Sequence, residues 1–298
     1  MKILRDKVLG SILGGAIGDS LGGAYEGWQE WVDIDDKVDW QLSDDTQLTL
    51  ATCEAIVENQ GTADPAVIAA QFAVWHRARR VTGLGASTLK ALIELAAGGH
   101  WALVGRKGDR AAGNGSAMRI APLAFCLDPS EPEARRTIRD VSRITHHHEE
   151  AYAGALAVVI AVRAAGTGSW RGAENLLHLV ASGLPDTEVK DRLGAIAELA
   201  ETVSLLEIAR RFGCSGYVCE SVPLALCAAG RVQRLGFQPM LTELVRCGGD
   251  TDTIAAIAGQ VAGALLGEKN LPKEWLARLP QQEFIRLAAM RFAELVAV

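Results

Sequence analysis

Residues Arg246–Gln260 read RCGGDTDTIAAIAGQ, and the interpretation of the whole chain depends on this stretch. Two aspartates, Asp250 and Asp252, stand on a glycine-rich turn directly before an apolar run from Ile254 to Leu266. Aspartates at such a position either cap a helix, because its first backbone N–H groups lack partners, or bind another group. The stretch alone leaves both interpretations open.

A second stretch, LSDDTQLTL at Leu42–Leu50, has the same design, with Ser43, Asp44 and Asp45 before an apolar-periodic run. Each turn on its own is typical of a helix cap. Four carboxylates brought together would raise one another's pKa, whereas two divalent cations would neutralise them. Oxygen ligands without cysteine or clustered histidine favour Mg²⁺, Mn²⁺ or Ca²⁺ over zinc. The paired turns therefore predict a metal site, provided that they meet in space.

Helical periodicity runs through nearly the whole chain, and alternating strand-like runs are almost absent. Aromatic residues make up 5% of the chain, so small aliphatic residues must form most of the core, which suits closely packed helices. We therefore predict an all-α fold with a single compact multi-helix domain over residues 1–298. The predicted helices are Val8–Leu21, Thr46–Glu58, Pro65–Ala78, Thr88–Ala97, Ala117–Phe125, Glu133–Ser142, Glu149–Ala165, Arg171–Ala181, Val189–Leu199, Leu205–Phe212, Val218–Ala229, Pro239–Arg246, Thr253–Leu266 and a last one from Gln281.

Glycines interrupt several of these helices, among them Gly14, Gly18, Gly259 and Gly263. A glycine inside a helix costs about 1 kcal/mol relative to alanine. These positions therefore predict that helices approach each other closely.

The composition also narrows the class of protein. The net charge is -6 and no block of basic residues offsets it, which argues against a nucleic-acid partner. None of the six cysteines forms a C-x-x-C pair, and the chain has no cleavable leader pattern and no uncharged stretch of membrane-span length. We therefore expect a soluble cytoplasmic protein without membrane contact, and a monomer.

Six ordered motifs resemble the ADP-ribosylglycohydrolase family, and the similarity extends over roughly Val8 to Gly267. They are GAIGDSLGGAYE (Gly15–Glu26), SDDTQL (Ser43–Leu48), GNGSAMRIAPLA (Gly113–Ala124), THHHEEAYAGA (Thr145–Ala155), GYVCESVPLAL (Gly216–Leu226) and GGDTDTIAAIAG (Gly248–Gly259). The family includes hydrolases that remove ADP-ribose from modified arginine.

The resemblance implies a compact all-α domain with a dinuclear metal cleft that holds two Mg²⁺ or Mn²⁺ ions. The implied metal ligands are Ser43, Asp44, Asp45, Asp250, Asp252 and Thr253. The implied reaction is hydrolysis of the bond between the ribose anomeric carbon and a protein side chain or a small molecule, so the partner is an ADP-ribosylated protein or ADP-ribose conjugate. Two adjacent cations can bind the vicinal ribose hydroxyls and orient the sugar towards an activated water.

The resemblance also assigns residues to catalysis and to substrate binding. Asp44 and Asp45 belong to catalysis, and Glu26 is the candidate acid–base carboxylate or a gate over the site, although it also fits a solvated charge beyond a helix end. Arg119 fits either a diphosphate contact or an ion pair, and Asp19 fits a residue that ties two helix ends together outside the site. The implied substrate-binding residues are Gly83, Asn114, Gly115, Ser116, Met118, Thr145 and His146, whereas His147 and His148 fit surface positions.

The chain departs from the arginine-directed pattern at Thr82–Leu92, where Gly83 and Ala86 replace an aspartate and an asparagine. The resemblance assigns that aspartate to the acceptor guanidinium or the attacking water. A serine linkage, O-acetyl-ADP-ribose or another acceptor is therefore open beside arginine. Two alternatives to this hydrolase are a two-metal phosphohydrolase and a non-enzymatic, crystallin-like or ADP-ribose-binding member of the family.

Overall fold

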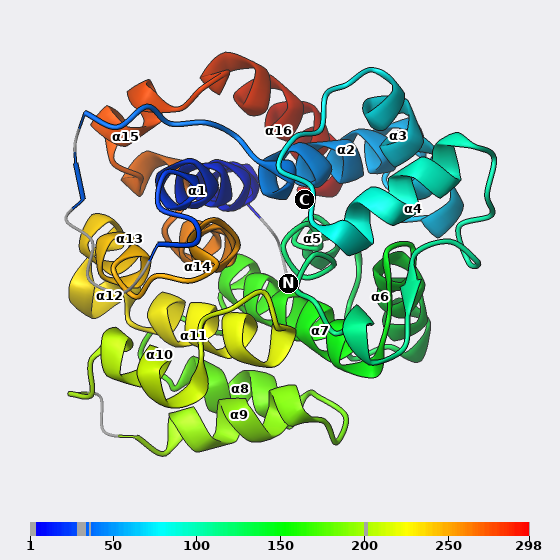
Figure 1. Cartoon of the computed structure of the whole chain (residues 1–298). Coiled ribbons are helices and arrows are strands. Elements are labelled where there is room, and N and C mark those ends of the chain that lie inside the picture. Colours follow the sequence, from blue (N-terminus) through cyan, green and yellow to red (C-terminus); the bar gives the residue numbers. More distant parts are fainter. Residues whose placement is uncertain (1–3, 29–33, 36, 200–201, 298) are drawn as a thin grey trace.

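The computed structural model describes residues 4–28, 34–35, 37–199 and 202–297, and almost all of their regular structure is helical (Figure 1). The predicted all-α fold is confirmed. The α-helices in these ranges are α1 (Arg5–Gly23), α2 (Asp44–Glu58), α3 (Pro65–Arg77), α4 (Ala86–Ala96), α5 (Leu123–Cys126), α6 (Pro132–Arg143), α7 (Glu149–Thr167), α8 (Leu176–Ser182), α9 (Glu188–Ala197), α10 (Leu205–Phe212), α11 (Val218–Gly230), α12 (Val232–Leu235), α13 (Phe237–Val245), α14 (Thr251–Leu266), α15 (Lys273–Arg278) and α16 (Gln282–Val296). Two short strands, β1 (Arg106–Lys107) and β2 (His146–His147), pair in parallel.

The centre of the fold is the contact between α1 and α14, which lie side by side in Figure 1. Glycines of α1 meet the backbone of α14 at successive turns. A Cβ atom at Gly14 would lie 2.5 Å from the carbonyl oxygen of Gly259, and one at Gly18 would lie 2.0 Å from that of Ala255. The predicted close approach of glycine-bearing helices is therefore confirmed.

This contact brings the end of α1 to the start of α14. A Cβ atom at Gly22 would lie 2.3 Å from the carbonyl oxygen of Thr251, and the Thr251 hydroxyl donates to the Gly22 carbonyl at 2.8 Å. The start of α2 joins the same place, because Asp19 of α1 accepts hydrogen bonds from Ser43 and Thr46. Three helix ends thus converge.

The remaining helices surround this centre. Helix α7 packs on both α14 and α11, α16 packs on α1 and α2, and α3 packs between α2 and α4. Helices α8, α9 and α10 lie together at the bottom of Figure 1. Helix α7 is long and apolar enough to cross a membrane by length and composition, but 78% of its apolar window is buried inside the protein. Such burial is typical of a core helix.

One predicted helix is wrong, and another, Arg171–Ala181, begins later than predicted, at Leu176 after the N-cap Asn175. Of Ala117–Phe125, only the last residues are helical, in α5. The preceding residues form tight turns, in which the N–H of Ile120 bonds to the carbonyl of Ala117 and the N–H of Leu123 bonds to that of Ile120. Pro122 has no N–H and disfavours helical geometry in the residue before it. The short helices α12 and α15 were not predicted, because four to six residues give too little periodicity.

Candidate functional site

The first acidic turn begins helix α2. Ser43 is the N-cap, and its Oγ accepts the backbone N–H of Asp45 at 3.2 Å. Asp44 and Asp45 follow in the first helical turn, and both are buried. The Oδ1 atom of Asp45 has no hydrogen-bond partner among the described residues. The turn is therefore a helix cap, as one interpretation predicted, but capping leaves an orphaned buried oxygen unexplained.

The second acidic turn begins helix α14. Asp250 is the N-cap residue, yet its side chain makes no capping hydrogen bond. Its carboxylate instead accepts the side-chain amide of Asn114 at 2.7 Å. Gly248 and Gly249 precede it with φ of 74° and 78°, a region that favours glycine. The backbone N–H of Asp250 donates to the carbonyl of Cys214 at 2.9 Å, which fixes the turn.

The two acidic turns meet. The Thr253 hydroxyl donates to Oδ2 of Asp45 at 3.3 Å, across the start of the two helices. Carboxylate oxygens gather in two groups, each within 4.8 Å: Asp19 with Asp45 and Asp252, and Glu26 with Asp250 and Asp252. Asp252 belongs to both groups. The condition that the sequence could not test, that the turns lie together, is therefore fulfilled.

Asp19 has two functions in this arrangement. Its buried carboxylate accepts the hydroxyl of Ser43 at 2.7 Å, the hydroxyl of Thr46, and both of their backbone N–H groups. It ties α1 to the start of α2, as predicted. The same carboxylate also lies in one of the acidic groups, which the sequence interpretation had placed it outside. A charged residue in the otherwise uncharged stretch from Val8 to Gly23 was the available signal.

The electrostatics of the cluster follow from burial and repulsion. Burial, followed by the charge of Asp252, raises the pKa of Asp45 well above its usual range. Burial and the neighbouring Asp250 raise the pKa of Asp252 to about 9, and the same two causes raise the pKa of Glu26. Burial and the charge of Asp19 raise the pKa of Asp44. Carboxylates held in this way are strongly disfavoured as anions unless a cation compensates them.

The donor set fits a hard divalent cation. Every group in the two acidic clusters offers a carboxylate oxygen, and the hydroxyls of Ser43 and Thr253 both contact Asp45. Oxygen-only sites of this kind suit Mg²⁺, Mn²⁺ or Ca²⁺. The orphaned Oδ1 of Asp45 is consistent with a ligand atom. The clusters could therefore hold metal ions.

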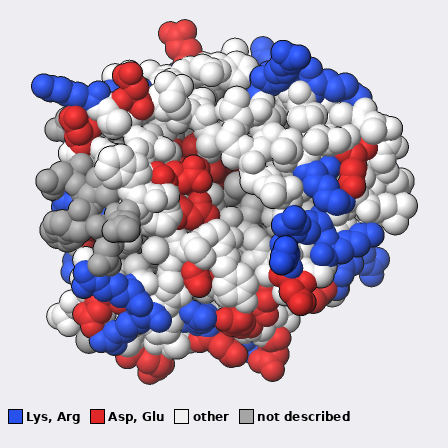
Figure 2. Space-filling model, in the orientation of Figure 1, with Lys and Arg blue, Asp and Glu red and all other residues white. Residues whose placement is uncertain are grey.

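A cleft of about 490 Å³ opens beside these carboxylates. Figure 2 shows acidic side chains gathered in the hollow at the centre of this face. The predicted site residues that line the cleft are Glu26, Asp44, Gly83, Asn114, Gly115, Met118, His146, Asp250, Asp252 and Thr253. The predicted residues Ser43, Asp45, Ser116 and Thr145 do not line it. Lining residues that the sequence interpretation did not select include Arg106, Ser87, Thr88, Ser215 and Gly216.

The glycine-rich loop Gly113–Ser116 is not followed by the predicted helix Ala117–Phe125. The loop therefore offers no helix N-terminus to a ligand. The Ser116 hydroxyl is fully buried, donates to the carbonyl of Ala151 at 3.3 Å and accepts the hydroxyl of Ser142 at 2.9 Å. The Ser116 side chain therefore points into the interior, and substrate binding at this residue stays a prediction. Gly113 and Gly115 do line the cleft.

His146 stands behind those glycines. A Cβ atom at Gly115 would lie 2.8 Å from Cε1 of the ring, and one at Gly113 would lie 3.1 Å from Nε2. Only glycine therefore fits beside this ring. The two histidines that follow lie outside the cleft lining, but both are half-buried and not at the surface as expected: His147 bonds through Nε2 to the carbonyl of Val104 at 2.6 Å, and His148 caps α7.

The Gly83 segment forms another wall of the cleft. Gly83 has φ of 77°, and a Cβ atom there would lie 3.3 Å from Cβ of Ser43 and 3.7 Å from Oδ1 of Asp44. Gly85 and Ala86 also line the cleft. The positions at which the chain departs from the arginine-directed pattern therefore face the site directly.

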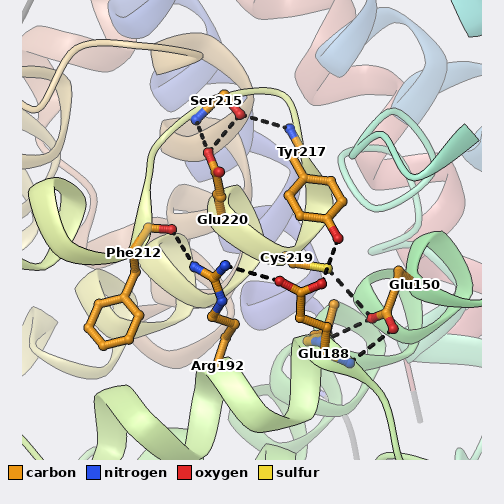
Figure 3. A network of polar contacts seen from close by, with 9 residues as sticks. Glu150, Glu188, Arg192, Phe212, Ser215, Tyr217, Cys219 and Glu220 are labelled. Carbon is orange, nitrogen blue, oxygen red and sulfur yellow. Dashed lines mark hydrogen bonds and ion pairs between the residues drawn. The ribbon is translucent and has the colours of Figure 1, made fainter. Parts of the chain in front are cut away.

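The segment from Cys214 to Tyr217 joins the second acidic turn to the glycine-rich loop. Its carbonyls at Cys214 and Gly216 accept the N–H groups of Asp250 and Asn114, at 2.9 and 3.1 Å. Figure 3 shows the polar network that holds this segment. Glu220 accepts both the N–H and the hydroxyl of Ser215, at 3.0 and 2.7 Å.

The same network continues to helix α9. The Tyr217 hydroxyl donates to Glu188 at 2.7 Å, and Arg192 donates to Glu188 at 3.0 Å and to the carbonyl of Phe212 at 2.7 Å (Figure 3). Both ends of the cleft wall are therefore anchored outside the cleft.

Fold and site together define an all-α protein with an oxygen-rich acidic cleft suited to hard divalent cations. A family model described as ADP-ribosylglycohydrolase matches residues 1–298. The chain belongs to the ADP-ribosylglycohydrolase family. Members of this family are hydrolases that act on glycosidic bonds of ADP-ribose, so the predicted family and enzyme class are confirmed.

Individual relatives are similar in sequence to this chain over nearly its whole length. ADP-ribosyl-[dinitrogen reductase] glycohydrolase of Rhodospirillum rubrum is 27% identical, over 93% of this chain and 91% of the relative. ADP-ribosylarginine hydrolase Tri1 of Serratia proteamaculans is 28% identical, over 94% of this chain and 77% of the relative. A solved structure titled ADP-ribosylglycohydrolase-related protein complex has a TM-score of 0.78 at 27% identity and covers 98% of both chains.

Proposed function

We propose that this protein is a metal-dependent hydrolase that releases ADP-ribose from a modified protein side chain or a small molecule. Hydrolysis breaks the bond at the ribose anomeric carbon. Two divalent cations, Mg²⁺ or Mn²⁺, are held between the acidic turns. The observation that supports this proposal best is that Asp252 belongs to both clusters of carboxylates, which suits a pair of adjacent ions.

The roles of the side chains follow from their positions. Asp45 and Asp252 are buried and would hold the cations together with Asp19 and Asp250, and Asp44 would contribute from the cleft lining. When bound, the cations supply Lewis-acid contacts to ribose hydroxyls and neutralise charge. Glu26 is the most exposed carboxylate of the cluster and lines the cleft, and burial and the charge of Asp250 raise its pKa, which favours a role as a proton donor.

For the acceptor, we favour an oxygen linkage over an arginine linkage. The wall at Gly83, Gly85 and Ala86 carries neither charge nor amide where the arginine-directed pattern has an aspartate and an asparagine. A guanidinium acceptor would have no carboxylate from this wall. The name of the Serratia relative specifies arginine for that protein, and arginine is the second candidate here.

Release of ADP-ribose, followed by chromatography, tests the proposal. The panel contains a serine-linked peptide, O-acetyl-ADP-ribose and an arginine-linked peptide, each with Mg²⁺, Mn²⁺ or EDTA. We expect metal-dependent release from an oxygen-linked substrate and its loss in Asp252→Asn. Release from the arginine peptide alone would contradict the acceptor assignment, and free phosphate as the product would indicate a phosphohydrolase.

Binding of ADP-ribose without release from any substrate would indicate a reader or crystallin-like protein. The cytoplasmic location and the monomeric state stay predictions, and sedimentation of the purified chain tests the latter.

A further inference from the structure

A chain of three buried polar side chains ends at the cleft. Arg119 Nη2 donates to Oγ1 of Thr145 at 2.8 Å, and that oxygen lies 2.8 Å from Nδ1 of His146. Arg119 and Thr145 are completely buried, and His146 is 3% exposed. His146 lines the cleft between Gly113 and Gly115, whereas Thr145 does not line it. The chain therefore connects the interior to the cleft surface.

The directions of these hydrogen bonds follow from the groups themselves. A guanidinium is only a donor, so Thr145 Oγ1 accepts from Arg119. The Thr145 hydroxyl hydrogen then needs an acceptor, and among the described residues the atom that can accept it is Nδ1 of His146. If Nδ1 instead carried a hydrogen, the buried hydroxyl hydrogen would have no partner, which native structures avoid. Nδ1 is therefore unprotonated, and the ring hydrogen sits on Nε2.

The surroundings also keep the ring uncharged. Burial, followed by the positive charges of Arg119 and Arg106, lowers the pKa of His146 to about 3. When the adjacent His147 is protonated, its positive charge lowers the pKa of His146 further. Arg119 stays protonated at neutral pH, because burial lowers its pKa only to about 9. A neutral imidazole beside a permanent cation is the result.

The energetic cost of Arg119 supports a specific role. Its Nε and Nη1 atoms are buried without hydrogen-bond partners in the described structure, and its guanidinium lies 4.7 Å from the ring centroid of Phe72. The sequence left a diphosphate contact or an ion pair open for this residue. The structure shows neither, because Arg119 does not line the cleft and its hydrogen bonds go to Thr145 and the carbonyl of Val141.

We propose that Arg119 and Thr145 are positioning residues that lock His146 as the neutral Nε2–H tautomer, so that His146 offers a hydrogen-bond donor to an oxygen of the ADP-ribose moiety. This inference rests on the proposed function for its ligand. Among the described residues Nε2 has no partner, and its edge of the ring faces the two cleft-lining glycines. An uncharged donor selects an oxygen acceptor by geometry rather than by net charge.

The tautomer is measurable without ligand. Two-bond proton–nitrogen correlation spectra of the ¹⁵N-labelled protein report which ring nitrogen carries the hydrogen, and a His146→Asn spectrum assigns the signal. We expect a protonated Nε2 and an unprotonated Nδ1 at neutral pH. His147 provides an internal reference, because its Nε2 faces the carbonyl of Val104 and must donate. A protonated Nδ1 or an imidazolium at His146 would overturn the proposal.

Variants connect the tautomer to ligand binding. Calorimetry with ADP-ribose should show Thr145→Ser within about threefold of the wild type, because the hydroxyl remains, and Thr145→Val weaker by about tenfold or more. Thr145→Val should also shift His146 toward the Nδ1–H form. His146→Gln retains an N–H near the Nε2 position and should bind at least about tenfold more tightly than His146→Asn, which places its amide elsewhere. His147→Gln is the matched control and should bind normally.

The outcomes separate this inference from the proposed function. If the wild type shows the Nε2–H tautomer but does not bind ADP-ribose, the proposed function fails. If ADP-ribose binds and Thr145→Val and His146→Asn bind as tightly as the wild type, the inference fails and the function stands. Should Thr145→Val not fold, the His146→Gln and His146→Asn pair decides the role of the donor.

Discussion

Replacing Asp252 by asparagine should stabilise the metal-free protein while removing its response to metal. Asp252 is 6% exposed and belongs to both carboxylate groups. Burial, Asp250 and Glu26 raise its pKa to about 9. A carboxyl with a raised folded-state pKa favours folding when it is protonated, so its contribution declines as pH rises from about 4 to about 9.

The size of the effect follows from this pKa. At pH 7 the gap to the unfolded value near 3.9 corresponds to at most about 4 kcal/mol. Relaxation and the sharing of charge among neighbouring carboxylates reduce this value, and we expect about 2 kcal/mol. For a chain of this size, that gain corresponds to about 4 °C in the unfolding temperature. Asparagine also keeps the Oδ1 acceptor that receives the N–H of Thr253 at 2.8 Å.

Thermal unfolding at pH 7.5 in EDTA and in MnCl₂ measures both effects. In EDTA, Asp252→Asn should unfold at a higher temperature than the wild type. With Mn²⁺ at about 100 times its Kd, the wild type should gain about 2.7 kcal/mol and the variant little, so the order reverses. Asp39→Asn removes the same charge from an exposed position and should change neither curve. A variant that is less stable in EDTA, or that keeps the full response to Mn²⁺, would refute this reasoning.

Four further predictions concern helix packing, helix propensity, the cleft wall and pH. Gly18→Ala should destabilise the protein by about 3 kcal/mol or more in urea unfolding, because its Cβ would lie 2.0 Å from the carbonyl oxygen of Ala255. Gly194→Ala, with nothing within 4 Å of its Cβ, should stabilise helix α9 by about 1 kcal/mol. Glu220→Ala should increase hydrogen exchange in the peptides over 112–118 and 246–252, because it removes the oxygen that accepts both donors of Ser215. Glu220→Gln should not, because its amide oxygen can still accept both donors. The affinity for Mn²⁺, measured by calorimetry, should rise from pH 6 to pH 8 because the raised pKa values of the carboxyls make protons compete with the metal; a flat profile would contradict those values.

The fold was largely predictable because its signals are periodic. Apolar residues at helical spacing predicted nearly all the long helices, and glycines within them predicted close helix contacts, which the structure shows between α1 and α14. The segment Ala117–Phe125 shows the limit of this reasoning. Its residues are apolar and mostly buried, but Pro122 and the turns after Asn114 determine its backbone conformation. The spacing of apolar residues indicates neither the proline nor the turns.

The sequence predicted which residue types form the site better than it predicted which side chains reach the cleft. Two similar acidic turns indicated metal ligands, and the structure brings them together. Which side chains reach the cleft depends on packing over long sequence distances. Ser116 points into the interior towards Ser142 and Ala151, and Arg106 reaches the cleft through a two-residue strand that carries no sequence signal.

The position of the site explains how the fold tolerates so many buried carboxylates. Helices α2 and α14 both begin at the cluster, so their N-terminal dipoles favour the negative charge of Asp44, Asp45 and Asp252. The Thr251 hydroxyl bonds to the Gly22 carbonyl and so holds the start of α14 to the end of α1, and Asp19 of α1 likewise holds the start of α2 through Ser43 and Thr46. Repulsion among the carboxylates therefore cannot relax by opening the cluster. The repulsion decreases when the cluster binds protons or cations. The stability of the protein, the protonation of the carboxyls and the affinity for metal are therefore thermodynamically linked.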